Sequence, residues 1–229
     1  VMQGGSRRSA IYASLNWQHG DIHDFLKAKD WASMPVGSTG KTLWDIKQED
    51  FNFPAPLDMT NISVNYDTEW LLNYYKTGEV GEVFMQNVRQ AMQSAEPGFS
   101  FNFFDKENET LRNACTEVTS EDDSDVCNLG SVNMGRISDI AEMADVVALG
   151  TKFLICGTLK AKLPYNKVYE TREKNRRLGL GLMGMHEWLI QRGSNYTVTP
   201  ELHSWLSVYK GVSDKVSRET ADEFGISRP

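Results

Sequence analysis

Strand-like and helix-like segments alternate along the first half of the chain, and this alternation constrains the fold more than any other feature. Ala10–Trp17 has the apolar, β-branched character of a short strand, and Asp21 then offers an N-cap for a helix over Ile22–Asp30. Met59–Val64 and Phe99–Phe104 have the character of two further strands. Because strands joined through helices usually lie parallel, the pattern predicts an α/β fold.

The rest of the chain is mostly helical in pattern. Further helices are expected at Asp67–Tyr75, Glu79–Ala95, Ile137–Leu159, Lys174–Arg192 and Pro200–Phe224. Trp31–Pro56 is rich in Gly, Pro, Ser and Lys and predicts a long loop, whereas Val126–Met134 is extended in pattern. Since the sequence shows neither an internal repeat nor a clear linker, we expect residues 1–229 to form one α/β unit of the kind that closes into a barrel or a doubly wound sheet.

Composition narrows the classes of function. A net charge of −7 disfavours nonspecific binding to duplex DNA, and the apolar runs are too short for a membrane span. The three cysteines are too few and too irregularly spaced for a disulfide framework or a zinc site, which favours a reducing cytoplasm and no bound metal. No signal peptide follows Val1, and both ends look cut, so we expect an internal piece of a longer protein.

Two neighbouring segments carry the residues most suited to chemistry. In Asn113-Ala114-Cys115-Thr116-Glu117, an extended or tightly looped backbone places an amide, a thiol and a carboxylate on the same side. A hairpin turning through Glu121–Asp125 would then bring Cys127 beside Cys115. Buried cysteines that pack as small apolar side chains are the structural alternative, but Glu117 argues against it because carboxylates are rarely buried without a partner.

The order of the motifs resembles a known family. Asn-x-Cys-x-Glu followed by Cys-Asn-Leu-Gly-Ser-x-Asn resembles the finger loop and following strand of the catalytic subunit of ribonucleotide reductases. Gln3–Ser9 resembles the loop through which that family couples substrate and effector, and Asn175–Gly184 resembles its Arg-rich helix start. The aromatic strand after Pro97-Gly98 precedes the finger loop as it does in the family, so the resemblance spans nearly the whole chain.

The resemblance implies part of a ten-stranded α/β barrel with a central finger loop, followed by a helical stretch. It implies reduction of ribonucleotides to 2′-deoxyribonucleotides through a thiyl radical, which Cys115 would carry. Glu117 matches the base that takes the 3′-hydroxyl proton, and Asn113 matches the amide that holds the ribose hydroxyls. Cys127 matches one of two cysteines that supply electrons and end as a disulfide, and the second lies upstream of this chain in the family.

The same resemblance implies ligands and partners. Gln3, Gly4, Gly5 and Arg7 would contact the base or phosphates of a substrate or effector nucleotide, although such a segment is also an ordinary turn between exposed basic residues. Adenosylcobalamin is favoured as the radical source over a separate dimetal radical subunit. The expected partners are a ribonucleotide substrate, a nucleotide effector, the flanking reductase segments, a thioredoxin-like reductant, and a second copy or a radical-generating subunit.

Several other residues are assigned structural roles. Cys156 lies in an apolar helical stretch and is expected to pack there, and His19 and His23 are expected at a helix start rather than at a metal. Gly37–Thr42 mimics the end of a phosphate-binding P-loop, but the required first glycine would fall at a proline. The arginines at positions 176 and 177 either cap a helix or serve the site, and the glycines that follow favour close packing of that helix.

A second class of function stays open from the sequence alone, namely a noncatalytic nucleotide-binding or assembly module that keeps the reductase fold. The joint presence of Cys115, Glu117 and Cys127 argues against it. Nucleotide binding without exchange of the 3′-hydrogen would favour it. On the reductase reading, the chain alone is expected not to catalyse, because the product disulfide needs a further cysteine.

Overall fold

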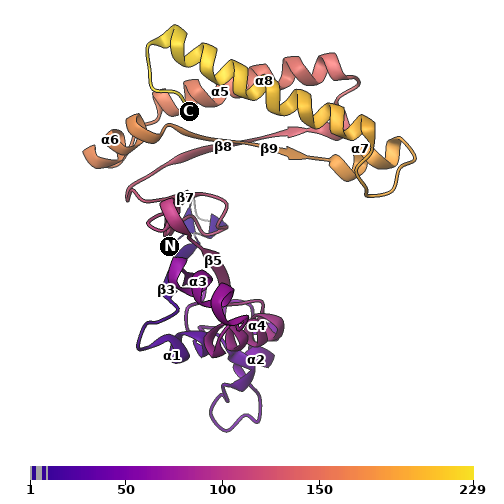
Figure 1. The fold of residues 1–229 in the computed structure, drawn as a ribbon. Coiled ribbons are helices and arrows are strands. Elements are labelled where there is room, and N and C mark those ends of the chain that lie inside the picture. Colours follow the sequence, from indigo (N-terminus) through magenta and orange to yellow (C-terminus); the bar gives the residue numbers. More distant parts are fainter. Residues whose placement is uncertain (1, 4–6, 9) are drawn as a thin grey trace. The chain divides into compact units, whose positions relative to one another are not determined.

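The computed structural model describes the backbone of residues 2, 3, 7 and 8 and all of residues 10–229. The chain forms two compact units, Val1–Asp122 and Asp123–Pro229, and each unit has its own sheet and apolar core (Figure 1). Among the described helices, none is both long enough and apolar enough to cross a membrane.

The first unit is built around a parallel sheet. Its elements in chain order are β1 (Met2–Gln3), β2 (Arg7–Arg8), β3 (Ile11–Asn16), α1 (Ile22–Lys27), η1 (Trp31–Ser33), α2 (Leu43–Glu49), β4 (Thr60–Tyr66), α3 (Thr68–Thr77), α4 (Glu82–Ser94), β5 (Gly98–Phe101), η2 (Phe104–Lys106), β6 (Leu111–Arg112) and β7 (Thr119–Ser120). The central strand β4 lies between β3 and β5 and is parallel to both. The three strands predicted from the sequence and the helices between them are confirmed.

The core of the first unit forms where α1, α3 and α4 pack with this sheet. Leu26 of α1, Val64 and Tyr66 of β4 and Trp70 of α3 are buried, and further aromatic rings surround them. The Tyr66 hydroxyl donates a hydrogen bond of 2.9 Å to the Asn87 side chain on α4, and burial raises the pKa of this tyrosine. Apolar and aromatic packing therefore holds these helices against the sheet.

The prediction of a long loop over Trp31–Pro56 is wrong in one respect, because this stretch contains the helix α2. Thr42 and Asp45 form a capping box, in which the Thr42 side chain accepts from the Asp45 N–H and the Asp45 carboxylate accepts from the Thr42 N–H. Such a box satisfies two N–H groups that a helix start leaves free. The helix buries Leu43 and Lys47, and the Lys47 amine binds the Asp58 carboxylate at 2.9 Å.

The second unit is a pair of parallel strands covered by helices. Its elements are β8 (Cys127–Asn133), η3 (Met134–Arg136), α5 (Ile140–Lys160), α6 (Asn166–Asn175), β9 (Arg177–Met183), α7 (Met185–Gln191) and α8 (Pro200–Phe224). Within this unit, α5 and α8 lie on the same side of β8 and β9 (Figure 1). The buried side chains of Met143, Val147, Trp188 and Trp205 form the centre of the core.

The predicted helix over Lys174–Arg192 is wrong, because the strand β9 and the helix α7 occupy this stretch. Leu178, Leu180 and Leu182 alternate with glycines, a period of two that lines up the leucines on one face of a strand. Each glycine would destabilise a helix interior by about 1 kcal/mol relative to alanine. In the strand, the missing side chain of Gly179 makes room for Leu129, whose Cδ2 would lie 2.5 Å from an added Cβ.

Gly184 turns the chain from β9 into α7. Its φ of +71° lies in the left-handed region, and a Cβ at this position would meet the Asn133 Oδ1 at 2.2 Å. A residue with a side chain would suffer both backbone strain and a collision there. The glycines were predicted to allow close packing of a helix. The close approach occurs instead between the ends of β8 and β9.

Candidate active site

Cys115 lies on a loop at the tip of a short hairpin. The strands β6 and β7 pair antiparallel, with Arg112 opposite Thr119 at the base of the loop. Residues 113–118 connect the two strands, and both Cys115 and Glu117 are exposed on this loop. The sequence was compatible with an extended or a tightly looped backbone at Asn113–Glu117, and the structure shows the tight loop.

Asn113 closes this loop through two of its own atoms. Its carbonyl oxygen accepts the Thr116 N–H at 3.0 Å, and its side-chain Oδ1 accepts the Val118 N–H at 3.1 Å. Thr116 has a φ of +68°, which turns the backbone between Cys115 and Glu117. Within the described residues the Asn113 Nδ2 donates no hydrogen bond, so the loop offers an amide donor, a thiol and a carboxylate to a ligand.

The base of the loop is attached to the parallel sheet by side chains. The Arg112 guanidinium donates from Nε to the Ser100 Oγ at 2.8 Å and from Nη2 to the Asn102 Oδ1 at 2.7 Å. Ser100 belongs to β5, and Asn102 follows that strand directly. The Cys115 loop is thus fixed to the carboxyl end of β5.

Cys127 opens β8 and lies on the face of the second unit's sheet that the helices do not cover. Side chains alternate between the two faces of a strand, and the neighbouring Asn128 points to α5, where its Nδ2 donates to the Leu154 carbonyl at 3.4 Å. A Cβ added to Gly179 of β9 would lie 3.5 Å from the Cys127 Sγ. The half-buried thiol of Cys127 therefore stands beside a glycine, on the open face.

Cys156 is on α5, on the opposite side of the sheet from Cys127. It is exposed on the surface of that helix, together with Phe153. The sequence predicted that it would pack in its apolar stretch, but it lies outside the core of the unit. The helical periodicity of α5 explains this, because the buried positions Leu154 and Ile155 lie on the face that contacts the strands and α8.

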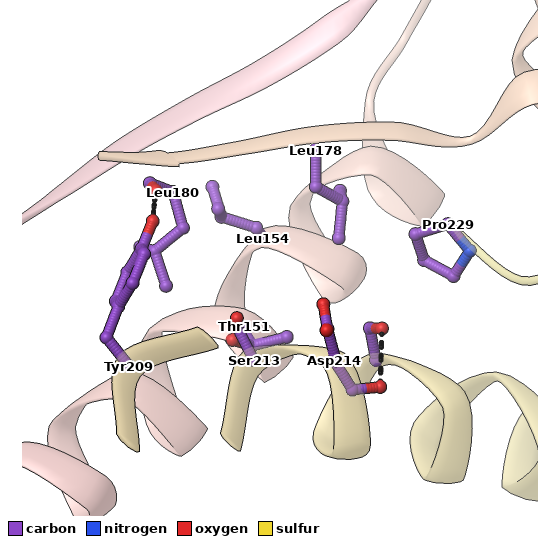
Figure 2. A pocket seen from close by; sticks show the side chains of 9 residues that line it. Thr151, Leu154, Leu178, Leu180, Tyr209, Ser213, Asp214 and Pro229 are labelled. Atoms are coloured by element: carbon purple, nitrogen blue, oxygen red, sulfur yellow. Dashed lines mark hydrogen bonds between the residues drawn. The ribbon is translucent and has the colours of Figure 1, made fainter. Parts of the chain in front are cut away.

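A hollow of about 240 Å³ lies between β9, α5 and α8 (Figure 2). Leu178 and Leu180 of β9 line it, which places it on the helix-covered face of the sheet, across from Cys127. The Tyr209 hydroxyl at its edge donates to the Leu180 carbonyl, and burial raises the pKa of this tyrosine. The hollow therefore forms no part of a site that includes Cys127.

Comparison with known proteins decides the family. The family model described as "Ribonucleotide reductase, barrel domain" matches residues 1–204 of the chain, which include the Cys115 loop, β8 and β9. The chain belongs to the ribonucleotide reductase family.

Relatives within this family resemble nearly the whole chain. A vitamin B12-dependent ribonucleoside-diphosphate reductase of Thermoplasma acidophilum is 26% identical over 99% of the chain. A protein of Mycobacterium phage D29, provisionally named an adenosylcobalamin-dependent ribonucleoside-triphosphate reductase, is 26% identical over 98% of it. A ribonucleoside-diphosphate reductase subunit alpha of Synechocystis is 24% identical over 98%. The chain spans about a third of the length of these reductases, namely 31%, 31% and 35%.

The prediction of a hairpin that turns through Glu121–Asp125 is wrong. The hairpin turns instead at residues 113–118, because β7 pairs with β6. The strand that begins at Cys127 pairs in parallel with β9, whose leucines extend the apolar face under α5 and α8. Cys115 and Cys127 belong to different units, so their expected proximity stays a prediction.

The loop near the start of the chain that is predicted to contact a nucleotide lies only partly within the described residues. Gln3 and Arg7 face each other as backbone partners in the antiparallel pair of β1 and β2. Gly4 and Gly5 lie outside the described residues. The binding role of these four residues stays a prediction.

The two adjacent arginines do not start a helix. Arg176 ends α6 in a left-handed conformation with a φ of +41°, and its buried guanidinium binds Glu173 and the Ser227 Oγ. Arg177 begins β9 and binds the Asp125 carboxylate at 2.5 Å. Both arginines hold elements of the second unit together, which supports the structural alternative.

The segment that mimics a P-loop is a surface turn. Residues 37–41 are exposed, Pro35 forms an isolated bridge with Thr42, and the Lys41 amine binds the Glu49 carboxylate at 2.6 Å. Thr42 itself is the N-cap of α2. The prediction of a solvent loop is confirmed.

His19 and His23 lie at the helix start where the sequence placed them. His19 and His23 flank the start of α1, and the His19 Nδ1 accepts the Asp21 N–H at 3.1 Å. The His23 Nδ1 lies 2.7 Å from the Gln86 Oε1 on α4. His186 is exposed on α7. Across residues 10–229, no group of three or more His, Cys, Asp or Glu residues could hold a metal ion.

Sequence reasoning missed Ser100, Asn102 and Arg112, which attach the loop to the sheet. A signal was present, because Ser100 and Asn102 are the alternate, polar positions of an otherwise aromatic strand. Such an alternation indicates that one face of the strand meets polar groups. Arg112 gave no comparable signal, since an arginine before a loop is most often solvated.

Proposed function

We propose that this chain is the part of a ribonucleotide reductase that carries the radical cysteine, and that the whole enzyme reduces ribonucleotides to 2′-deoxyribonucleotides. The observation that carries the proposal is the single exposed loop on which Asn113, Cys115 and Glu117 stand, in a chain of this family. The Cys115 thiyl radical takes the 3′-hydrogen atom and returns it at the end of the reaction. The 2′-hydroxyl leaves as water.

The polar neighbours of Cys115 fit two distinct tasks. The Asn113 Oδ1 accepts the Val118 N–H, so its Nδ2 remains the group that can donate to a ribose hydroxyl. The exposed carboxylate of Glu117 suits proton transfer from the 3′-hydroxyl, a contribution that is typically about 10²–10⁴-fold in rate. Binding and proton transfer would then come from the same loop as the radical.

Cys127 is proposed as one of two thiols that supply the two electrons and end as a disulfide. It is half-buried on the face of β8 and β9 that points away from the helices. Cys156 is a poor second thiol because it lies on α5, across the sheet. The partner of Cys127 is therefore a cysteine supplied by another segment of the reductase, and we expect no deoxynucleotide product from this chain alone.

The family and the names of the relatives support the finer proposals on fold and cofactor. We propose that the parallel strands of both units belong to one ten-stranded barrel. The exposure of Cys115 fits a radical delivered from outside the chain, by adenosylcobalamin or by a separate dimetal subunit. The motifs and the names of two of the relatives favour adenosylcobalamin, which supplies the initiating radical when bound.

Substrate and partners follow from the same proposal. A nucleotide would contact Gln3, Gly4, Gly5 and Arg7, and the relatives' names include both diphosphate and triphosphate reductases. A thioredoxin-like protein would reduce the disulfide in a reducing cytoplasm, and a second copy or a radical-generating subunit would complete the enzyme. The noncatalytic alternative is not favoured, because the relatives are named as reductases.

The test replaces each thiol separately in the complete reductase that contains this chain. Cys115→Ser should bind nucleotide but give neither deoxynucleotide nor exchange of the 3′-hydrogen. Cys127→Ser should keep 3′-hydrogen abstraction, seen as substrate-derived radicals, and lose sustained turnover. Cys156→Ser is the control and should keep normal activity. Turnover by Cys115→Ser above background would overturn the proposal, and binding without 3′-exchange in the unsubstituted enzyme would favour the noncatalytic module.

A further inference from the structure

The hairpin that carries Cys115 is too short to hold its loop by backbone pairing alone. Its strands share only the pairs Leu111 with Ser120 and Arg112 with Thr119. Isolated two-stranded hairpins are marginal in water even when they are longer. The position of Cys115 therefore depends on side-chain contacts at the base of the loop.

We propose that Arg112 is a positioning residue that holds the Cys115 loop at the carboxyl end of β5. This inference rests on the proposed function, because it assigns a catalytic consequence to the place of Cys115. Arg112 donates with two nitrogens, from Nε to the Ser100 Oγ at 2.8 Å and from Nη2 to the Asn102 Oδ1 at 2.7 Å. Two bonds from one planar group fix its orientation as well as its distance.

The acceptors of Arg112 form a closed ring with it. The Asn102 Nδ2 donates to the Ser100 Oγ at 3.0 Å, so each of the three side chains is bonded to the other two. Ser100 is 1% exposed and Asn102 is 3% exposed. The Asn102 N–H also donates to the Tyr66 carbonyl of β4 at 2.9 Å. The ring is thus part of the sheet, and the guanidinium is held against a rigid, buried surface.

The ring is continuous with the turn that presents Cys115. Asn113 follows Arg112 directly and makes the two hydrogen bonds that close the loop, to the N–H groups of Thr116 and Val118. On the opposite strand, the Thr119 Oγ1 donates to Glu109 at 2.7 Å. A shift of Arg112 would therefore move the whole turn relative to β5.

The functional consequence follows from the geometry that hydrogen-atom transfer needs. A misplacement of about 1 Å, caused by a change remote from the reacting atoms, can cost on the order of 10²-fold in rate. Lysine donates from one nitrogen only, so it cannot reproduce the planar, two-nitrogen contact of Arg112. Glutamine is neutral and shorter. In the complete reductase, Arg112→Lys should lower kcat by about 10-fold and Arg112→Gln by about 100-fold, with KM within about twofold of the unsubstituted enzyme.

A second readout follows the loop itself and needs no activity. In the same protein, Arg112→Lys should make the amides of Thr116 and Val118 exchange hydrogen at least about tenfold faster, while the amides of β4 keep their protection. Arg89→Lys is the control, because Arg89 is an exposed arginine of α4 in the same unit. It should change neither kcat nor the exchange of these amides.

Ser100→Ala removes an acceptor of the ring instead of its donor, and it provides the test if the Arg112 variants fold poorly. It removes one acceptor of Arg112 and keeps the other. Like Arg112→Lys, it should lower kcat and speed hydrogen exchange of the Thr116 and Val118 amides. The double variant with Arg112→Lys should lose less than the product of the two single effects, because both act through one contact. Independent, fully multiplicative effects would contradict the ring.

Two outcomes separate this inference from the proposed function. If Cys115→Ser abolishes reduction but folded Arg112→Lys and Ser100→Ala leave kcat and amide exchange unchanged, the positioning role is overturned. If both variants loosen the loop while Cys115→Ser keeps turnover, Arg112 holds the loop but the radical role of Cys115 fails. A rise in KM with unchanged kcat would also overturn the inference, because it would place Arg112 in nucleotide binding.

Discussion

The two units of the chain hold their cysteines in different ways. In the first unit, Cys115 stands on a loop that is fixed by polar side chains, the ring of Arg112, Ser100 and Asn102. In the second unit, Cys127 stands at the start of a regular strand with seven paired residues, and the apolar faces of α5 and α8 cover the far side of the sheet. Both units have apolar cores, but the Cys115 loop is held to its sheet by side-chain hydrogen bonds, whereas Cys127 is itself part of a paired strand.

This difference suits the proposed roles. A radical thiol must meet one carbon–hydrogen bond of the substrate, so its loop needs a fixed position relative to the sheet. A thiol that forms and breaks a disulfide must reach a partner and then a reductant, which requires access rather than a single position. We therefore expect the first unit to be sensitive to changes in its polar groups and the second to changes in apolar volume.

The largest effect is expected when the core of the second unit loses volume. Trp188 is fully buried, packs edge-to-face on Trp205 with ring centroids 5.1 Å apart, and has the Arg192 guanidinium 3.9 Å from its ring centroid. Trp188→Ala should lower the free energy of unfolding by about 3–5 kcal/mol. Hydrogen exchange should show lost protection in β8, β9 and α8 and retained protection in β3 and β4.

The control for this variant is Trp44→Ala, because Trp44 is 46% exposed on α2. It should change the free energy of unfolding by no more than about 0.5 kcal/mol. Equal loss of protection in both units on Trp188→Ala would show that they unfold together, and the contrast between them would then be one of local geometry only.

A smaller effect is expected at the polar end of the first unit's sheet. The Asp67 carboxylate accepts hydrogen bonds from Asn16 at 2.9 Å, from the Trp17 indole at 3.0 Å and from the Trp70 N–H at 3.1 Å. Burial by itself raises the pKa of Asp67, but these hydrogen bonds outweigh it and hold the pKa below its ordinary value. Asp67→Asn should lower the free energy of unfolding at pH 7 by about 1 kcal/mol.

The pH dependence of that difference has a definite sign. A carboxyl group whose pKa is lower in the folded state contributes its stability above the unfolded pKa, about 3.9 for Asp. The contribution is lost as the pH falls through the lower, folded pKa of Asp67. Urea unfolding from pH 7 to pH 2 should therefore show the difference between the unsubstituted chain and Asp67→Asn shrinking below about pH 4.

Asp21→Asn is the matched control, because Asp21 is also an N-cap in this unit but accepts no capping hydrogen bond. It should leave the free energy of unfolding unchanged at both ends of the pH range. A constant difference for Asp67→Asn at all pH values would assign its effect to packing, and would weaken the view that polar groups fix this edge of the sheet.

The regular elements were predictable where the pattern had one interpretation. The strands β3, β4 and β5 and the long helix α8 stood out by their periodicity and their boundaries. The strand β9 escapes prediction because its alternation of Leu and Gly also fits a helix whose glycines allow close packing. The helix α2 was missed because its capping box is embedded in a stretch with the composition of a loop.

The candidate site shows the same limit. Cys115, Glu117 and Cys127 could be chosen from a motif of neighbouring residues, since the local sequence contains all of it. The ring around Arg112 joins residues 10 and 12 positions apart in the chain, which the turn of the backbone from β5 through η2 to β6 brings together. Contacts of this kind follow from tertiary structure and leave little trace in a local pattern.

The smallest effect is expected at Lys41, whose surroundings resemble a P-loop in sequence and lack its geometry. A P-loop lysine reaches phosphates from a loop that follows a strand, whereas this segment follows η1 and lies across an isolated bridge between Pro35 and Thr42. Lys41 and its partner Glu49 are 46% and 63% exposed, so their ion pair should contribute about 0–1 kcal/mol and be screened by salt. Lys41→Ala should therefore leave nucleotide binding, measured by equilibrium dialysis, unchanged and alter the free energy of unfolding by less than about 0.5 kcal/mol. A tenfold loss of nucleotide affinity would place a phosphate at this loop, and the first unit would then hold a ligand by an exposed segment as well as by the fixed loop of Cys115.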